Sequence, residues 1–171
     1  MRILVISDIH ANYTAFETVL KHADNQWDYV WCLGDVVGYG ANPKECIATL
    51  RDLGAPVVAG NHDYAVTGKL DVEFFNSYAK SAVLWTREQL NEEEMTWLKS
   101  LRLVQIVDEC ITLVHGSLNF PDMFDYIQTS YDAYLSLEAL KTKVCFLGHS
   151  HVPVSFFSGP AVSYSLSPEI D

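Results

Sequence analysis

Five of the six histidines share one kind of sequence context. They follow short apolar runs typical of buried strands, and each lies within three residues of Asp, Asn or Gly. The segments are Asp8-Ile9-His10, Gly60-Asn61-His62-Asp63, Val114-His115-Gly116 and Gly148-His149-Ser150-His151, and Gly34-Asp35 ends another apolar run. In α/β proteins, ligands bind at the carboxyl ends of the strands. We therefore expect these side chains to meet in one site.

These side chains are of the kind that bind transition metals. Ions of the first transition row accept imidazole nitrogen together with carboxylate and amide oxygen. A pair of ions needs a bridging carboxylate, and Asp35, on a tight turn after Gly34, can direct its oxygens at ions ~3.5–4 Å apart. The lack of thiolate favours Mn first, then Fe, Zn, Co or Ni, over Mg or Ca. Two such ions lower the pKa of a bridging water and neutralise a phosphoryl group.

Each segment alone also has a simpler interpretation. Asp8 could cap a helix and leave His10 on the surface, and Gly34-Asp35 could be an ordinary turn. Asn61-His62-Asp63 could cap a helix or form an Asx turn. His115 could be a hydrogen-bonded core residue. His149 and His151 are more specific, because residues two apart at a strand edge face the same way and can share one ion. Five coincidences at five strand ends argue for a site.

The elements that position these segments begin with a β-α-β-α-β pattern. Residues 2–7, 29–33 and 57–59 form aliphatic, β-branched runs typical of buried strands. Helical spacing of apolar residues marks 12–22, and a first-turn proline followed by an apolar face marks 43–54. This order implies parallel strands with right-handed crossovers.

The later part of the chain has a different pattern. Helices are predicted at 71–90 and 91–101, the second with a capping box formed by Asn91 and Glu94. A hairpin follows at 104–107 and 111–114, then a loop over 116–130, a helix at 131–141, and strands at 144–147, 154–157 and 161–166. The sequence contains no internal repeat or linker, so we expect one α/β domain, residues 1–171, with a mixed sheet system.

Composition narrows the function classes. The 171 residues are 49% hydrophobic with a formal charge of −11, which excludes a disordered chain and a broadly basic surface for duplex nucleic acid. No apolar run reaches the ~18–20 residues of a membrane span. The apolar run at the N-terminus is also shorter than the apolar region of a signal peptide. The four cysteines form no CxxC and are expected to be reduced. A cytoplasmic protein without a membrane partner is the prediction.

Five ordered blocks resemble the calcineurin-like metallophosphoesterase superfamily, and most closely its small prokaryotic phosphodiesterases and diadenosine-tetraphosphatase-like enzymes. The blocks are SDIHANYTAF, LGDVVGYGANP, AGNHD, VHGS and LGHSHVP. The resemblance implies an α/β fold of two packed mixed β-sheets flanked by helices, a four-layer αββα sandwich. Related chains continue past the last block into a segment like Asn-Pro-Gly-Ser, whereas this one ends at Ser167-Pro168-Glu169-Ile170-Asp171. The sequence therefore predicts a sandwich that lacks the strands closing it in related chains.

The resemblance also implies roles for the site residues. Asp8, His10 and His151 would hold one divalent ion, Asn61, His115 and His149 the other, and Asp35 would bridge the two. In such enzymes a metal-bound hydroxide attacks phosphorus. His62 would contact the phosphate and protonate the leaving oxygen, as expected of a histidine near neutral pH. Asp63 would orient or charge His62.

The substrate is less defined by sequence than the reaction. Asn12, Tyr39, Asn61 and His62 are candidates for substrate contact, and Phe120, Phe124 and Tyr126 could stack on a nucleobase or simply pack under their loop. Two divalent ions beside Asp8 and Asp35 would leave a local charge of about +2, which suits a small phosphoester despite the acidic chain. The leading hypothesis is an enzyme that hydrolyses a small phosphodiester, nucleotide or dinucleoside polyphosphate. The alternatives are a serine/threonine-type protein phosphatase and a catalytically silent scaffold, although a scaffold would be expected to have lost ligands that are all present here.

Overall fold

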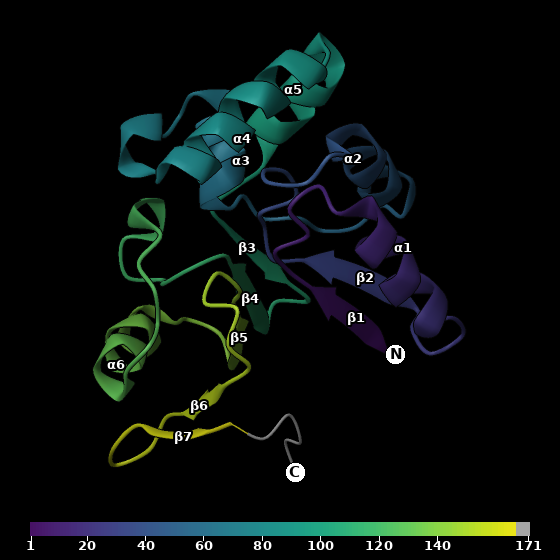
Figure 1. Ribbon diagram of the computed structural model, residues 1–171. Coiled ribbons are helices and arrows are strands. Elements are labelled where there is room, and N and C mark those ends of the chain that lie inside the picture. Colours follow the sequence, from purple (N-terminus) through teal and green to yellow (C-terminus); the bar gives the residue numbers. More distant parts are fainter. Residues whose placement is uncertain (167–171) are drawn as a thin grey trace.

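The computed structural model describes residues 1–166. The terminal segment 167–171 lies outside the described residues, and so does the prediction that the strands closing the sandwich are missing. Figure 1 shows α1 and α2 on one side of the strands and α6 on the other. The helices and strands are β1 (Ile3–Ile6), α1 (Tyr13–His22), β2 (Tyr29–Cys32), α2 (Pro43–Asp52), α3 (Asn61–Thr67), α4 (Ser77–Gln89), α5 (Glu92–Ser100), β3 (Val104–Val107), β4 (Ile111–Val114), α6 (Ser130–Ala139), β5 (Val144–Phe146), β6 (Ser155–Phe157) and β7 (Ser163–Ser165), with short 3-10 helices at Val72–Phe74 and Pro121–Met123.

The described strands form three small sheets. β1 and β2 pair in parallel, with Ile3 opposite Tyr29 and Ile6 opposite Cys32. The central strand β4 pairs antiparallel with β3 and parallel with β5, so this sheet is mixed. β6 and β7 form an antiparallel hairpin. The predicted α/β class with mixed sheets is confirmed.

Apolar side chains pack the first two sheets together. Trp31 and Leu33 on the β2 side meet Leu113 of β4 and Val58, and Ile3, Val5 and Ile111 pack around them. The ring of Trp31 meets that of Phe146 edge-on, with centroids 6.3 Å apart. This layer fixes the ends of β1 and β2 relative to those of β4 and β5.

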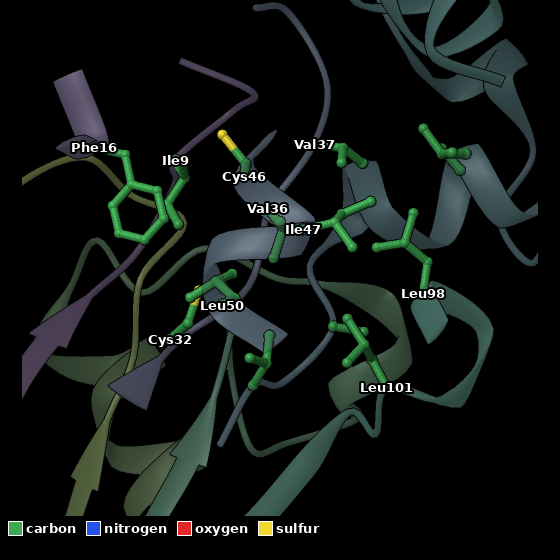
Figure 2. Close-up of a cluster of buried hydrophobic side chains, with 14 of the residues drawn as sticks. Ile9, Phe16, Cys32, Val36, Val37, Cys46, Ile47, Leu50, Leu98 and Leu101 are labelled. Atoms are coloured by element: carbon green, nitrogen blue, oxygen red, sulfur yellow. The ribbon is translucent and has the colours of Figure 1, made fainter. Parts of the chain in front are cut away.

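The opposite face of β2 is covered by helices. Because side chains alternate along a strand, Cys32 points away from the Trp31 face. It joins the larger core with Phe16 of α1, Ile47 and Leu50 of α2, and Leu98 of α5 (Figure 2). The four cysteines are free thiols, and burial raises the pKa of Cys46 and Cys145 to about 12, as expected for structural cysteines.

Two predicted elements differ in the structure. The expected strand at 57–59 makes only isolated parallel bridges, from Cys32 to Val57 and from Val58 to Arg102. The expected helix at 71–90 begins at Ser77, because the Asn76 side chain accepts the Ala79 N–H and caps α4 there. The capping box of Asn91 and Glu94 is confirmed, with hydrogen bonds of 2.8 and 2.9 Å. No helix among residues 1–166 has both the length and the apolar character to cross a bilayer.

Candidate metal centre

The ends of the strands bring all seven predicted metal ligands together. Asp8 and His10 follow β1, Asp35 follows β2, Asn61 begins α3, His115 follows β4, and His149 and His151 follow β5. The ligand atoms form overlapping groups within 4.8 Å of one another: Asp8, His10 and His151; His10, Asp35 and His62; Asp35, His115 and His149. The convergence expected from the strand-end pattern is therefore present in the structure.

The first predicted ligand set gathers around one carboxylate oxygen of Asp8. Asp8 Oδ1 lies 3.3 Å from Nε2 of His151 and 3.9 Å from Nε2 of His10. This oxygen is buried, and no hydrogen bond to it is formed within residues 1–166. The other oxygen, Oδ2, accepts the backbone N–H of His149 at 3.0 Å. Asp8 thus has one oxygen fixed by the backbone and one directed into the site.

The second predicted set centres on His115. Its Nδ1 lies 2.8 Å from the carbonyl oxygen of Leu33, so this nitrogen carries the donated hydrogen. Its Nε2 lies 3.2 Å from Asn61 Oδ1 and 3.1 Å from His149 Nδ1. Oxygen and nitrogen atoms with lone pairs repel one another at such distances unless a cation or a proton lies between them.

Asp35 connects the two sets. Its Oδ2 lies 3.4 Å from Nε2 of His115 and 3.7 Å from Nε2 of His10, so a single oxygen faces both groups. Its Oδ1 accepts the backbone N–H of His62 at 2.8 Å. Asp35 is therefore placed as a bridging carboxylate would be, between the two sets.

The backbone of the site is strained in a way that glycine neighbours make possible. Five of the seven ligands lie in the left-handed region of φ, which non-glycine residues rarely occupy: Asp8, His10, Asp35, His149 and His151, with φ from 49° to 67°. A Cβ on Gly60 would lie 2.1 Å from Asp35 Oδ1, and one on Gly148 would lie 1.9 Å from Ser7 Oγ. Such strain concentrates at functional sites, where the fold holds it in place.

The carboxylates of the site keep the ring of His115 protonated near pH 7. Burial alone would lower the pKa of His115, but the Asp35 and Asp8 carboxylates raise it to about 9. Burial, together with the charge of His115, lowers the pKa of His149 to about 4. Burial would raise the pKa of Asp35, yet His115, His62 and His10 hold it well below its usual range. The carboxylate of Asp35 is therefore ionised and attracts a cation.

His62 lies beside the ligand sets, in the first turn of α3. Its ring meets Phe75 edge-on at 5.0 Å, His10 at 4.8 Å and Tyr39 at 4.6 Å, centroid to centroid. Burial lowers the pKa of His62 to about 4, so the imidazole is neutral near pH 7 and carries one N–H. Phe75 was predicted to lie in the helix at 71–90, and its contact with His62 was not predicted. The sequence gives no sign of this contact, because an aromatic residue that packs in the core has the same pattern as one that lies against a site residue.

Asp63, in the first turn of α3, binds backbone amides with its carboxylate. Its side chain is fully buried, and both of its oxygens accept backbone N–H groups, from Val36, Val37 and Gly60. Burial and the Asp35 charge raise the pKa of Asp63, whereas these N–H donors favour its ionised form. The carboxylate is thus engaged with the loop after Asp35, and the role predicted for it toward His62 stays a prediction.

Two half-exposed tyrosines flank the centre. Tyr39, with φ of 58°, lies against His10 and His62, whereas Tyr126 stacks on His149 with ring centroids 3.9 Å apart. Of the other substrate candidates, Asn12 caps α1 by accepting the Ala15 N–H. Phe124 is buried against His115, as the packing interpretation expected. A cavity of about 250 Å³, lined by Asp8, Gly148, Ser150 and His151 among others, opens beside the first set.

Comparison with known proteins identifies the family. The family model for calcineurin-like phosphoesterases matches residues 1–168. The chain belongs to this calcineurin-like phosphoesterase family.

Among curated relatives, an uncharacterized protein of Methanocaldococcus jannaschii is 40% identical over 156 residues, covering 88% of this chain and 63% of its own length. A symmetrical bis(5'-nucleosyl)-tetraphosphatase of Nitrosococcus oceani is 35% identical over 148 residues, covering 82% of this chain and 51% of that protein. The chain thus spans less than two thirds of the length of these relatives.

Solved structures confirm the fold. A metallophosphoesterase from Sphaerobacter thermophilus superposes with a TM-score of 0.78 and 44% identity, covering 90% of this chain and 62% of that one. A protein from Pyrococcus horikoshii superposes with a TM-score of 0.70 at 20% identity, covering 89% of this chain and 70% of that one.

The family implies divalent metal ions, and the residues present fit them. The donor atoms are imidazole nitrogens, carboxylate oxygens and one amide oxygen, which is the mixture that first-row divalent ions accept. Asp8 Oδ1 is a buried carboxylate oxygen without a hydrogen bond from residues 1–166, and imidazole nitrogens of His151, His10 and His115 stand 3.3–3.9 Å from it. A cation at this point would balance an otherwise costly buried charge.

Proposed function

We propose that this protein is a binuclear-metal-dependent phosphohydrolase acting on a small phosphodiester, nucleotide or dinucleoside polyphosphate. The observation that carries the proposal is the position of Asp35 Oδ2, which faces His10 of one ligand set and His115 of the other. Two divalent ions bound there would supply a strong nucleophile from water and would neutralise the phosphoryl oxygens. Mn²⁺ is the ion proposed first, on the mixed nitrogen and oxygen donors.

The protein's own residues divide the remaining work. Asp8, His10 and His151 would hold one ion, Asn61, His115 and His149 the other, and Asp35 both. His62 lies beside His10 and is placed to donate an N–H to a phosphate oxygen. Its imidazolium form, which a pKa of about 4 makes a small fraction near pH 7, would give a proton to the leaving oxygen and return to neutral imidazole. Tyr39 and Tyr126 offer rings and hydroxyl groups at the entrance.

Two further observations support a small phosphoester. The Nitrosococcus oceani relative is named for a dinucleoside tetraphosphate, a small substrate made of phosphoric anhydrides between nucleosides. The chain as a whole is acidic, with a charge of −11, which is unfavourable for long polyanions that bind through many basic contacts. A small anion needs only the local positive charge of the ions.

Hydrolysis of bis-p-nitrophenyl phosphate, measured with and without Mn²⁺, tests the proposal. We expect Mn²⁺-dependent turnover in the wild type and a loss of more than about 100-fold in Asp35→Asn, because ligand partners one shell further out already cost 10–100-fold. Elemental analysis after Mn²⁺ loading should give two ions per chain, and fewer than about 1.5 would contradict the binuclear centre.

A second assay defines the substrate. The Mn²⁺-loaded protein is screened against nucleotides, cyclic nucleotides, dinucleoside polyphosphates and phosphopeptides. Preference for a phosphopeptide would replace the small-molecule proposal with a protein phosphatase. A protein that binds two ions and hydrolyses none of these compounds would instead be a scaffold.

A further inference from the structure

We propose that Asp63 is a positioning residue that holds the bridging ligand Asp35 in place, and that it acts through the backbone of residues 36–37. This inference rests on the proposed metal centre. Asp63 is 0% exposed, and its carboxylate accepts hydrogen bonds from the two amides that follow Asp35 along the chain.

The hydrogen bonds between the Asp35 turn and the first turn of α3 are reciprocal. Asp63 Oδ1 accepts the N–H of Val37 at 3.2 Å, and Asp63 Oδ2 accepts that of Val36 at 3.3 Å. In the other direction, Asp35 Oδ1 accepts the N–H of His62 at 2.8 Å. Each carboxylate thus binds the backbone of the other's segment, which leaves Asp35 Oδ2 as the oxygen that faces the ligand sets.

Asp63 differs from the other acidic residues that occupy the same helix position. Glu94 in α5 and Asp132 in α6 also stand three residues after a helix cap and accept the N–H of the cap residue. Both lie at the surface, and the partners of Asp132 are all within its own turn, at Gln128 and Thr129. Asp63 accepts the corresponding N–H of Gly60 at 2.9 Å, and in addition reaches across 26 and 27 residues of sequence. Capping alone requires neither burial nor this second contact.

The same hydrogen bonds also position Gly38, which packs against the ring of His62. Val36 and Val37 lead directly into Gly38, whose backbone lies so close to His62 that a Cβ there would be 2.5 Å from the imidazole Nδ1. With both oxygens occupied by backbone amides, the Asp63 carboxylate influences His62 through the position of this loop. Asp63 would therefore set the positions of Asp35 and Gly38 together.

The test substitutes Asp63→Asn in the full chain and measures Mn²⁺ affinity by calorimetry. An asparagine retains the size but turns an NH₂ group toward backbone N–H donors. We expect the affinity for Mn²⁺ to fall about 10–100-fold, as for other residues that orient metal ligands. The pH dependence of kcat at saturating Mn²⁺ should keep its wild-type midpoints, because the variant moves His62 without removing a hydrogen bond to its ring.

Asp132→Asn is the matched control, since it removes a carboxylate from the same helix position whose hydrogen bonds stay within its own turn. It should bind Mn²⁺ like the wild type. If Asp63→Asn does not fold, as judged by circular dichroism, Asp63→Glu carries the test, because it retains the charge but displaces the carboxylate by one methylene; the same loss of affinity is expected.

Several outcomes would overturn the inference. These are wild-type affinity in a folded Asp63 variant, a shifted pH profile with unchanged affinity, or an equal loss in Asp132→Asn. A wild type that binds no Mn²⁺ would overturn both this inference and the proposed function. A wild type that binds two ions without hydrolysing phosphoesters would overturn only the proposed function, because the affinity measurement does not depend on turnover.

Discussion

The ring of Tyr126 lies nearly parallel to that of His149, with centroids 3.9 Å apart and an angle of 14° between the planes. His149 Nδ1 is in turn 3.1 Å from Nε2 of His115. Tyr126 therefore covers one face of a ligand ring and limits its rotation, although half of the tyrosine is open to solvent.

Removal of this stack should weaken the second ion site. A stacked aromatic pair contributes about 0.5–1.5 kcal/mol, so Tyr126→Ala should lower Mn²⁺ affinity about 3–10-fold. Tyr126→Phe keeps the ring and should bind Mn²⁺ like the wild type. Titration calorimetry measures the Mn²⁺ affinity of both variants. An equal loss of affinity in Tyr126→Ala and Tyr126→Phe would assign the effect to the hydroxyl group instead of the ring.

His62→Ala should still bind two ions, but its kcat should fall by an amount that depends on how basic the leaving oxygen is. A general acid contributes about 10²–10⁴-fold in rate when the leaving oxygen is basic and much less when it is a p-nitrophenolate. We expect kcat to fall strongly for an alkyl or nucleoside ester and only slightly for bis-p-nitrophenyl phosphate. Full activity on the poor leaving group would show that His62 is not the acid.

Gly38→Ala should lower activity by displacing His62. The new Cβ would lie 2.5 Å from His62 Nδ1, at a φ of +94°. Gly54→Ala is the control, since Gly54 also has a left-handed φ, of +60°, but nothing lies within 4 Å of the added atom. Both variants should lose about 1 kcal/mol of stability from backbone strain. Thermal unfolding and kcat separate the effects, and only Gly38→Ala should lose turnover, by about 10-fold or more.

Metal binding should release a proton. The pKa of His115 is raised to about 9, so its ring is protonated below that pH, whereas His149, with a pKa lowered to about 4, is neutral near pH 7. An ion that takes the Nε2 position of His115 must displace the proton. Anaerobic calorimetry with Mn²⁺ in buffers of different ionisation enthalpy should give about one proton per chain near pH 7, decreasing toward pH 9. No release near pH 7 would contradict the protonated state of His115.

The convergence of the candidate ligands was predictable from sequence because two simple regularities lead to it. Residues such as Asp8 and His115 directly follow aliphatic runs, and parallel strands place their carboxyl ends at one edge. The fixed spacing of His149 and His151 adds a local signal. The α/β class follows from the same alternation of strands and helices in the first 60 residues.

The parts that sequence did not predict depend on contacts between distant segments. Helix α3 has seven residues and a glycine cap without a side chain, so little in its own sequence favours it. Its first turn is fixed by Asp35, which accepts the His62 N–H, and by Asp63, which binds Val36 and Val37. Tyr126 lies in a loop without periodicity, and its stack on His149 could only be seen once both were placed.

The hydrogen bond between the His149 backbone and Asp8 joins residues 141 positions apart. During translation, Asp8 and His10 leave the ribosome well before His149 and His151. Closing so long a segment has an entropic cost that must be met before the contact forms. Ions held by both segments would therefore stabilise the chain only after the second segment had been synthesised and had reached the first.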